Sequence, residues 1–167
     1  LVALQAPNGP GIAAAVVALR RAGAAVALLD ERTPEDERRR IVAALGAGAV
    51  VRLGACWELD PAAVVVERTA TPPSDLPPGT AFVKLTSGST GAPRGIAISA
   101  EALAADDEGL ARTMGLESDE RILAAVPASH SYGLSSVLLP ALVRGSTMVV
   151  PEGDGPFAAI DAARAAD

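Results

Sequence analysis

The chain is poor in cysteine, histidine and aromatic side chains. Its 167 residues include one cysteine and one histidine, and aromatic residues make up 2% of the total. An internal disulfide is therefore excluded, and a reducing cytoplasm is the predicted compartment. No cluster of residues has the spacing of metal ligands, so no metal site is predicted within the chain.

Long apolar runs and basic clusters are also missing. No apolar stretch approaches the roughly 18 residues that a membrane helix needs. The formal net charge is -6, from 14 basic and 20 acidic residues, which argues against a nucleic-acid surface. A membrane span and a nucleic-acid partner are therefore not expected. Both ends of the chain are expected to be cropped, because Leu1 already lies in a strand-like run and a helix-like stretch runs into Asp167.

The residues that are present indicate an α/β fold. A composition of 50% hydrophobic and 20% charged residues is typical of a soluble globular domain. Short apolar runs alternate with helix-like patterns, which predicts βαβ units, a mainly parallel sheet and helices on its faces. The predicted strands are 1–4, 26–29, 49–53, 81–85, 95–98, 122–126 and 147–150, and the predicted helices are 12–22, 35–45, 101–114, 133–143 and a last one begun by Pro156.

The helix predicted over residues 35–45 has signals at both ends. Thr33 is the predicted N-cap and Pro34 the first helical residue, followed by acidic residues in the first turn,. Gly46 is the predicted stop.

A proline-rich segment follows the predicted strands and helices of the first half. Residues 69–79 contain four prolines, which exclude a helix or a central strand. The segment is predicted to be an extended connector between a sub-block over 1–68 and a second one over 80–167.

The loop over residues 86–95 carries the clearest chemical signal. Its ten residues include three glycines, four hydroxyl side chains and Arg94, with no large apolar side chain. A tight hairpin needs only two loop residues, so this length indicates function or mobility. Glycine backbone N–H groups, hydroxyls and a guanidinium suit phosphate oxygens. The loop thus predicts a polyphosphate site, with a flexible surface loop as the alternative.

The loop does not have the pattern of nucleoside triphosphatases. Lys84 precedes the glycines and a strand is predicted to follow them, whereas that pattern places a lysine after the glycines and before a helix. The chain also lacks the glycine pattern of dinucleotide-binding folds.

Two motifs in order resemble those of the adenylate-forming enzymes, which include acyl- and aryl-CoA synthetases, luciferase-like ligases and peptide-synthetase adenylation domains. Residues 86–95 resemble the family's phosphate loop, and residues 127–134 (Pro-Ala-Ser-His-Ser-Tyr-Gly-Leu) resemble the motif that lines its acyl pocket. Residues 6–10, 21–24 and 28–30 are similar to its early helix and strand. The resemblance implies an incomplete N-terminal AMP-binding domain with Rossmann-like layered sub-blocks. The family's acidic magnesium motif, ribose-binding aspartate, hinge and C-terminal domain with a catalytic lysine have no counterpart in these 167 residues.

The resemblance implies two groups of site residues. Arg94 stands where the family usually has lysine, which keeps the charge but changes a point ammonium into a planar fork. His130 is expected to lie beside the substrate carboxylate, Tyr132 to form a wall of the acyl pocket, and Gly133 to keep space for the acyl chain. The phosphate-binding residues are expected to be Thr86, Ser87, Gly88, Ser89, Thr90, Gly91 and Arg94. No complete catalytic set is expected in this chain.

The resemblance also implies a reaction. A fatty or aryl carboxylic acid attacks the α-phosphorus of ATP, pyrophosphate leaves, and the acyl group passes to a thiol. Coenzyme A is the expected acceptor, with a carrier-protein thiol as the other possibility, and Mg²⁺ is expected to be held mostly outside this chain. The 167 residues alone are expected to be inactive.

Two other functions stay open. One is a non-catalytic remnant that binds a nucleotide weakly or not at all. The other is a serine hydrolase or acyltransferase in which Ser99, Ser129 or Ser131 acts with His130, although no GxSxG elbow supports it,.

Paired acidic residues are expected to be solvated helix starts and faces. Neighbours in sequence point apart on a helix, so they do not form an acid/base pair or a metal site. The pairs are Glu35–Asp36, Asp106–Asp107 and Asp119–Glu120.

Overall fold

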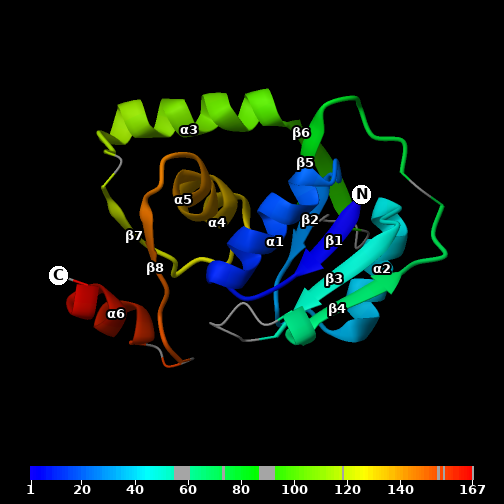
Figure 1. Ribbon diagram of the computed structural model, residues 1–167, viewed down its shortest axis with the longest axis horizontal. Coiled ribbons are helices and arrows are strands. Elements are labelled where there is room, and N and C mark those ends of the chain that lie inside the picture. Colours follow the sequence, from blue (N-terminus) through cyan, green and yellow to red (C-terminus); the bar gives the residue numbers. More distant parts are fainter. Residues whose placement is uncertain are drawn as a thin grey trace. The chain divides into compact units, whose positions relative to one another are not determined.

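The computed structural model describes residues 1–54, 61–72, 74–86, 93–117, 119–153, 155 and 157–166 (Figure 1). Two compact units make up the chain, Leu1–Ala100 and Glu101–Asp167. Among the residues described, no helix is both long and apolar enough to span a membrane.

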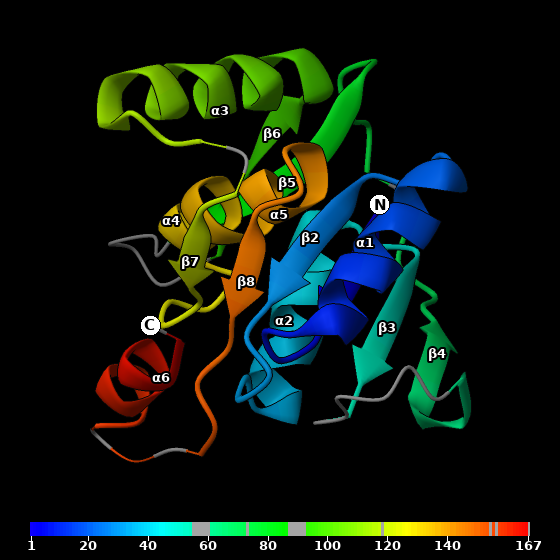
Figure 2. The same ribbon diagram turned by 60° about the vertical axis from the view of Figure 1, so that its left-hand side comes forward.

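The first unit contains a mainly parallel sheet, as predicted. The strand order is β4-β3-β1-β2-β5-β6, in which β3, β1, β2 and β5 are parallel neighbours and β4 and β6 are antiparallel edge strands (Figure 2). The strands are β1 (Val2–Gln5), β2 (Val26–Leu29), β3 (Ala49–Leu53), β4 (Val64–Arg68), β5 (Thr80–Thr86) and β6 (Arg94–Ser99).

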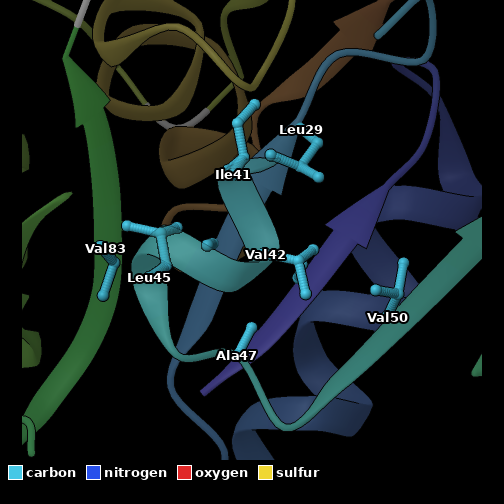
Figure 3. Close-up of a cluster of buried hydrophobic side chains, with 9 residues drawn as sticks. Leu29, Ile41, Val42, Leu45, Ala47, Val50 and Val83 are labelled. Atoms are coloured by element: carbon cyan, nitrogen blue, oxygen red, sulfur yellow. The ribbon is translucent and has the colours of Figure 1, made fainter. Parts of the chain in front are cut away.

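Two helices cover opposite faces of this sheet. α1 (Pro10–Arg21) joins β1 to β2, and α2 (Glu35–Leu45) joins β2 to β3, which lies on the other side of β1. Crossover connections between parallel strands are right-handed. The chain crosses the sheet in one direction from β1 to β2 and in the other from β2 to β3, so the second helix lies on the opposite face. Figure 3 shows α2 in front of the strands and α1 behind them.

The core on the α2 face is built from alternate strand residues and one stripe of the helix. Ile41, Val42 and Leu45 form one buried stripe of α2, because Leu45 comes about one turn after the other two,. Burying each of them stabilises the fold by about 1.5–3 kcal/mol. They pack with Ala3, Ala27, Leu29, Ala47, Val50 and Val83 (Figure 3).

Both ends of α2 lie where the sequence predicts them, but its start is capped differently. The expectation that Thr33 is the N-cap is wrong: Pro34 occupies that position and no side chain caps the helix. Gly46 ends the helix with φ 64°, the left-handed conformation that glycine adopts at low cost,.

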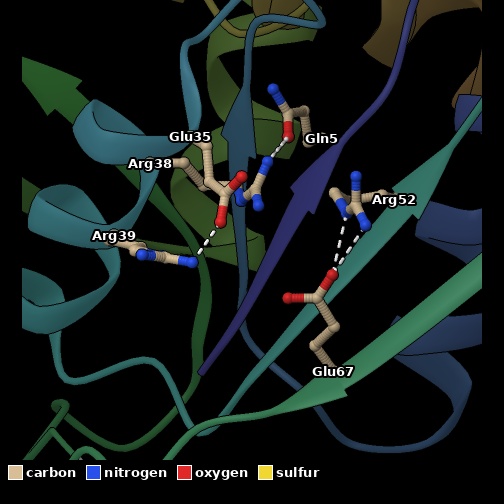
Figure 4. A network of polar contacts seen from close by, with 6 residues as sticks. All are labelled: Gln5, Glu35, Arg38, Arg39, Arg52 and Glu67. Carbon is tan, nitrogen blue, oxygen red and sulfur yellow. Dashed lines mark hydrogen bonds and ion pairs between the residues drawn. The ribbon is translucent and has the colours of Figure 1, made fainter.

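Thr33 takes part in a buried polar cluster through its carbonyl oxygen. The Gln5 side-chain Nε2 donates to the carbonyl oxygens of Asp30 (3.1 Å), Glu31 (3.2 Å) and Thr33 (2.9 Å). Its Oε1 accepts a 3.0 Å hydrogen bond from Arg38 Nη1 (Figure 4). Gln5 therefore fixes the turn between β2 and α2 through its main-chain carbonyls, while the first N–H groups of the helix have no side-chain cap.

Figure 4 also shows the half-exposed ion pair between Arg52 on β3 and Glu67 on β4, with N–O distances of 3.0 and 2.7 Å. Such a pair contributes about 0.2–1 kcal/mol. It joins β3 to the edge strand β4. The sequence did not predict β4, which follows a single 3-10 turn, η1 (Pro61–Ala63). Every residue of β4 is exposed.

The proline-rich segment has no helix or strand in its described part, as predicted. It is held along the end of α2, where the Thr69 and Ser74 amides donate to the carbonyls of Gly48 and Gly46 at 3.1 Å each. Strands on both sides of the segment belong to one sheet. The two compact units divide at Ala100 and Glu101 instead of at this connector.

The second unit pairs two short parallel strands, β7 (Arg121–Leu123) and β8 (Thr147–Val149). The predicted helix over 133–143 is one helical stretch in three parts: α4 (Ser131–Gly133), the π-helical η2 (Leu134–Leu138) and α5 (Leu139–Val143). α3 (Ala100–Met114) and α6 (Ala158–Ala166) confirm the other two helices. The predicted start of the last one, Pro156, lies outside the described residues.

Asp107 corrects the expectation that the acidic pairs are solvated. It is buried and accepts a 2.8 Å hydrogen bond from Arg144 Nε, and its carbonyl oxygen accepts a bond from Arg144 Nη2 at 3.1 Å. Its neighbour Asp106 is exposed, as expected. The ion pair joins α3 to the end of α5, 37 residues away, which local spacing does not reveal.

Candidate functional site

Two groups of candidate site residues are described, one within each unit, and they are called the Arg94 half and the His130 half. The Arg94 half consists of Thr86, Arg94 and Gly95 in the first unit. The His130 half consists of Pro127, His130, Tyr132 and Gly133 in the second. Each half is described within its own unit.

The Arg94 half is the base of an antiparallel hairpin. Thr86, the last residue of β5, pairs with Arg94, the first residue of β6, and its Oγ1 donates a 3.4 Å hydrogen bond to the Arg94 carbonyl. The strand predicted after the glycines is therefore confirmed, and both strands extend one residue further into the loop than expected. Arg94 is exposed at the point where the chain enters the hairpin strand. Its guanidinium is thus open to an anionic ligand.

Five predicted phosphate-binding residues of this loop, Ser87, Gly88, Ser89, Thr90 and Gly91, lie outside the described residues. Their role stays a prediction. Cys56 and Trp57, far from this loop in sequence, also lie outside them.

Gly95 follows Arg94 at a crowded position of β6. A Cβ at Gly95 would lie 2.5 Å from Val83 Cγ1 and 2.7 Å from Leu45 Cδ2. Both neighbours belong to the buried core between α2 and the sheet. The missing side chain therefore lets β6, and with it Arg94, lie close against the core.

The His130 half is a tight turn that leads into a helix. The His130 amide donates to the Pro127 carbonyl at 3.0 Å, and the His130 carbonyl accepts a bond from the Leu134 amide at 2.9 Å. His130 is the N-cap residue, with an extended backbone (φ -80°, ψ 148°) and no capping hydrogen bond from its side chain. Main-chain groups thus fix His130 on both sides.

The side chains of this turn are open to solvent. His130 is exposed, and Tyr132 is 61% exposed, which is unusual for a large aromatic residue,. The imidazole makes no capping hydrogen bond to the start of the helix. Both rings are therefore available to a ligand.

Gly133 lies against the backbone that precedes the turn. A Cβ there would lie 2.0 Å from the Pro127 oxygen and 2.9 Å from the Val126 oxygen. The glycine is buried, so the space beside it is filled by this chain's own main chain. The sequence expectation that it borders the acyl chain remains a prediction.

Two contributors were not among the predicted site residues. Pro127 and Gly95 belong to the two motifs. Pro127 contributes its carbonyl oxygen, and Gly95 contributes by having no side chain. The available signal was a glycine inside a predicted element, Gly95 in a strand and Gly133 in a helix. Glycine weakens both kinds of element, so its presence there indicates a position without room for a side chain.

The residues described contain no group of three or more His, Cys, Asp or Glu side chains that could hold a metal ion. The roles of the two halves toward phosphate and carboxylate oxygens stay predictions.

A comparison with protein families decides what kind of domain this is. The model of the AMP-binding enzyme family matches residues 1–166. The chain belongs to this family. Feruloyl-CoA synthase from an Amycolatopsis species is 34% identical over 182 aligned positions, which cover 96% of this chain and 35% of that protein. This AMP-binding chain thus spans about a third of that relative's length.

Solved structures agree on the fold of this AMP-binding chain. O-succinylbenzoate coenzyme A synthetase from Bacillus subtilis, in complex with AMP, superposes with a TM-score of 0.74 at 22% identity over 98% of this chain and 46% of that one. A malonyl-CoA ligase with methylmalonyl-CoA and AMP bound gives a TM-score of 0.68 at 29% identity over 88% of this chain and 34% of that one. The predicted α/β fold of an adenylate-forming N-terminal domain is confirmed.

Proposed function

We propose that this chain is part of an ATP-dependent ligase that activates a carboxylic acid as an acyl-adenylate and then forms a thioester, with coenzyme A as the acceptor. The observation that carries the proposal is the family match over residues 1–166. The 34% identity to a protein named feruloyl-CoA synthase favours coenzyme A over a carrier-protein thiol. An aryl or fatty acid is the proposed substrate class.

The proposed reaction has two balanced steps. A carboxylate oxygen forms a bond to the α-phosphorus of ATP while the bond to the β-phosphate oxygen breaks, and pyrophosphate leaves. A thiol then forms a bond to the acyl carbon and loses its proton, and AMP leaves with the bridging oxygen. Both steps move negative charge onto phosphate oxygens, so the barrier falls when fixed donors lie beside them.

The Arg94 half is the proposed donor set for pyrophosphate. Thr86 supplies a hydroxyl and Arg94 an exposed guanidinium at the base of the hairpin, and charge-assisted hydrogen bonds of this kind are the strong ones. The predicted hydroxyls and amides of residues 87–91 would complete the set. Mg²⁺, bound elsewhere in the full natural chain, would neutralise phosphate charge.

The His130 half is the proposed binding site for the carboxylic acid. The exposed imidazole can donate a hydrogen bond to a carboxylate, and the exposed Tyr132 ring offers an apolar wall to the acyl group,. Binding and orientation of the acid are therefore the proposed roles, not proton transfer.

Acid-dependent exchange of labelled pyrophosphate into ATP tests the proposal. The measurement uses the full natural chain that contains residues 1–167 and a panel of aryl and aliphatic acids. Exchange that depends on one class of acid is the expected result. Absence of exchange with every acid, in a folded sample that contains Mg²⁺, contradicts the proposal.

A non-catalytic remnant that binds a nucleotide weakly or not at all is the second candidate. Residues 1–167 alone are expected to form no acyl-adenylate. Adenylate formed by this purified segment, with contaminating synthetases excluded, would overturn that expectation. A serine hydrolase is the remaining candidate, and the chain has no GxSxG elbow that would support it,. The cytoplasmic location stays a prediction.

A further inference from the structure

Gly133 is a glycine whose backbone does not require one. Its φ of -62° and ψ of -37° are those of an ordinary right-handed helix, in which alanine is favoured over glycine by about 1 kcal/mol. It is the last residue of α4, in the first turn of a helical stretch of three joined elements, where a stronger helix former would help. The reason for glycine must therefore lie in its surroundings.

The surroundings are main-chain atoms on one side. A Cβ at Gly133 would lie 2.0 Å from the Pro127 oxygen, 2.6 Å from the Pro127 carbonyl carbon and 2.9 Å from the Val126 oxygen. Real Cβ atoms essentially never lie under 3.0 Å from such atoms, so an alanine would push this segment away by about 1 Å. A rotamer change cannot relieve the contact, because none of these atoms belongs to a side chain.

The same Pro127 oxygen holds His130. It accepts the 3.0 Å hydrogen bond from the His130 amide, so Gly133 covers the acceptor that sets the turn. A displaced Pro127 carbonyl must break this bond or carry the His130 backbone with it. The remaining anchor, from the Leu134 amide to the His130 carbonyl, comes from the helix on the other side of the turn.

The helix behind Gly133 leaves it little freedom to retreat. Leu134 and Leu138, at the two ends of the π-helical turn, are buried. Pro140, which has no backbone N–H, stands in the first turn of α5 directly after this turn,. The helix is therefore fixed by its own packing, and an added methyl group would act on the Pro127 segment.

We propose that Gly133 is a positioning residue for the carboxylic acid: its close contact with the Pro127 carbonyl sets the turn that presents the His130 imidazole. The inference rests on the proposed function for its substrate, and on the geometry alone for the link between Gly133 and His130. Gly133 acts through main-chain contacts and needs no direct contact with the acyl group.

The single histidine makes this link measurable without activity. NMR spectra of the 167-residue chain contain one set of imidazole signals, since His130 is the only histidine. In Gly133→Ala, these signals are expected to shift or broaden while the spectrum elsewhere keeps its folded dispersion. Unchanged imidazole signals in a folded Gly133→Ala would overturn the proposal.

Gly109→Ala is the matched control. Gly109 lies in α3 of the same unit, and a Cβ there would meet nothing within 4 Å. The same chemical change at that position is expected to leave the imidazole signals unchanged and to raise the melting temperature slightly, because alanine is the better helix former. An equal shift of the His130 signals in both variants would contradict a specific role for Gly133.

Kinetics in the full natural chain separate positioning from general loss of structure. Gly133→Ala is expected to raise the KM for the acid by about tenfold to a hundredfold, since a displacement near 1 Å costs that much in an oriented site. The KM for ATP is expected to change less than about twofold. Equal loss for both substrates would contradict the proposal.

A second variant keeps the test valid if Gly133→Ala does not fold. Pro127→Gly retains the carbonyl but removes the ring that fixes φ, so the turn is freed without new crowding. Pro127→Gly is expected to shift the imidazole signals and to raise the KM for the acid alone. The double variant Pro127→Gly/Gly133→Ala is expected to have a lower KM for the acid than Gly133→Ala. Unchanged signals and KM in Pro127→Gly would overturn the proposal. Wild-type protein without acid-dependent exchange would instead reject the proposed function, while the NMR comparison would still test the link.

Discussion

The two halves of the candidate site are both built beside a glycine that has no room for a side chain, but their neighbours differ. At Gly95 the neighbours are methyl groups of Val83 and Leu45, whereas at Gly133 they are the carbonyls of Val126 and Pro127. Methyl groups can move by a rotamer change or a small shift of the core, and a hydrogen-bonded carbonyl cannot. The Arg94 half is therefore expected to tolerate local change better than the His130 half.

The buried polar anchors of the two units also differ. In the first unit a neutral amide, Gln5, satisfies three carbonyls and the Arg38 guanidinium. In the second unit the anchor is an ion pair between Asp107 and Arg144. Loss of Asp107 leaves the Arg144 charge without its counter-charge, whereas loss of Gln5 leaves the buried Arg38 guanidinium without a neutral acceptor. Both units are therefore expected to depend on their anchors.

The largest effect is expected when the Arg94 half loses its charge. Arg94→Ala is expected to lower the rate of adenylation by about tenfold to a thousandfold, the value of a single donor to developing negative charge, with little change in the KM for the acid. Pyrophosphate exchange in the full natural chain measures it. Arg112→Ala is the control, because its 77% exposed side chain lies in a surface ion pair on α3. Unchanged exchange in Arg94→Ala would remove the distinction between the halves.

Removing the anchor of the second unit is the next effect in size. Asp107→Ala is expected to destabilise the protein by about 3 kcal/mol, the low end for a broken buried pair, because Arg144 keeps some contact with water,. Urea unfolding measures this loss. Asp106→Ala changes the exposed neighbouring residue and is expected to alter the free energy of unfolding by less than about 0.5 kcal/mol. Equal effects of the two substitutions would contradict the role of the ion pair.

The acid side is tested by His130→Ala. A lost hydrogen bond to a charged group costs about 1.5–3 kcal/mol, so the KM for the acid is expected to rise by about tenfold to a hundredfold and the preference among acids to change. The KM for ATP is expected to stay nearly the same. A variant that loses affinity for ATP but not for the acid would reverse the assignment of the two halves.

The smallest effect is expected at Gly95. Gly95→Ala is expected to destabilise the first unit by about 1 kcal/mol, at the low end for overpacking, because side-chain methyls can give way,. Combining it with Val83→Ala removes the nearest methyl, so the double variant is expected to lose less stability than the sum of the two single variants. Strictly additive losses in thermal unfolding would show that Val83 does not limit the position.

The fold was predictable where local signals and distant contacts agree. The strands over 26–29 and 49–53 and the helix over 35–45 have the predicted bounds, because buried apolar runs, a proline and a stop glycine all indicate the same elements. The predicted N-cap was wrong because Pro34, with an extended ψ of 154°, stays outside the helix and occupies the N-cap position itself. β4 was missed because its run of three valines, exposed throughout, has neither alternation nor a turn signal.

The site residues stay a prediction from residue types, whereas the local architecture around them could be compared with the structure. Hydroxyls, glycines and one arginine between two strands indicate phosphate chemistry from the sequence alone. The hairpin base at Thr86 and Arg94 bears out the predicted strands. The contact between Gly133 and Pro127 joins residues six apart through a carbonyl oxygen, and neither periodicity nor composition reports the position of a main-chain atom.

Transfer of oxygen from the acid to AMP tests the central claim most directly. The full natural chain that contains residues 1–167 is incubated with ATP, Mg²⁺, coenzyme A and an acid whose two carboxylate oxygens are ¹⁸O. Mass spectrometry then measures the ¹⁸O content of the AMP and phosphate products. Attack of the carboxylate on the α-phosphorus predicts one heavy oxygen in each AMP formed. AMP without the label, or label found in inorganic phosphate instead, would contradict the account.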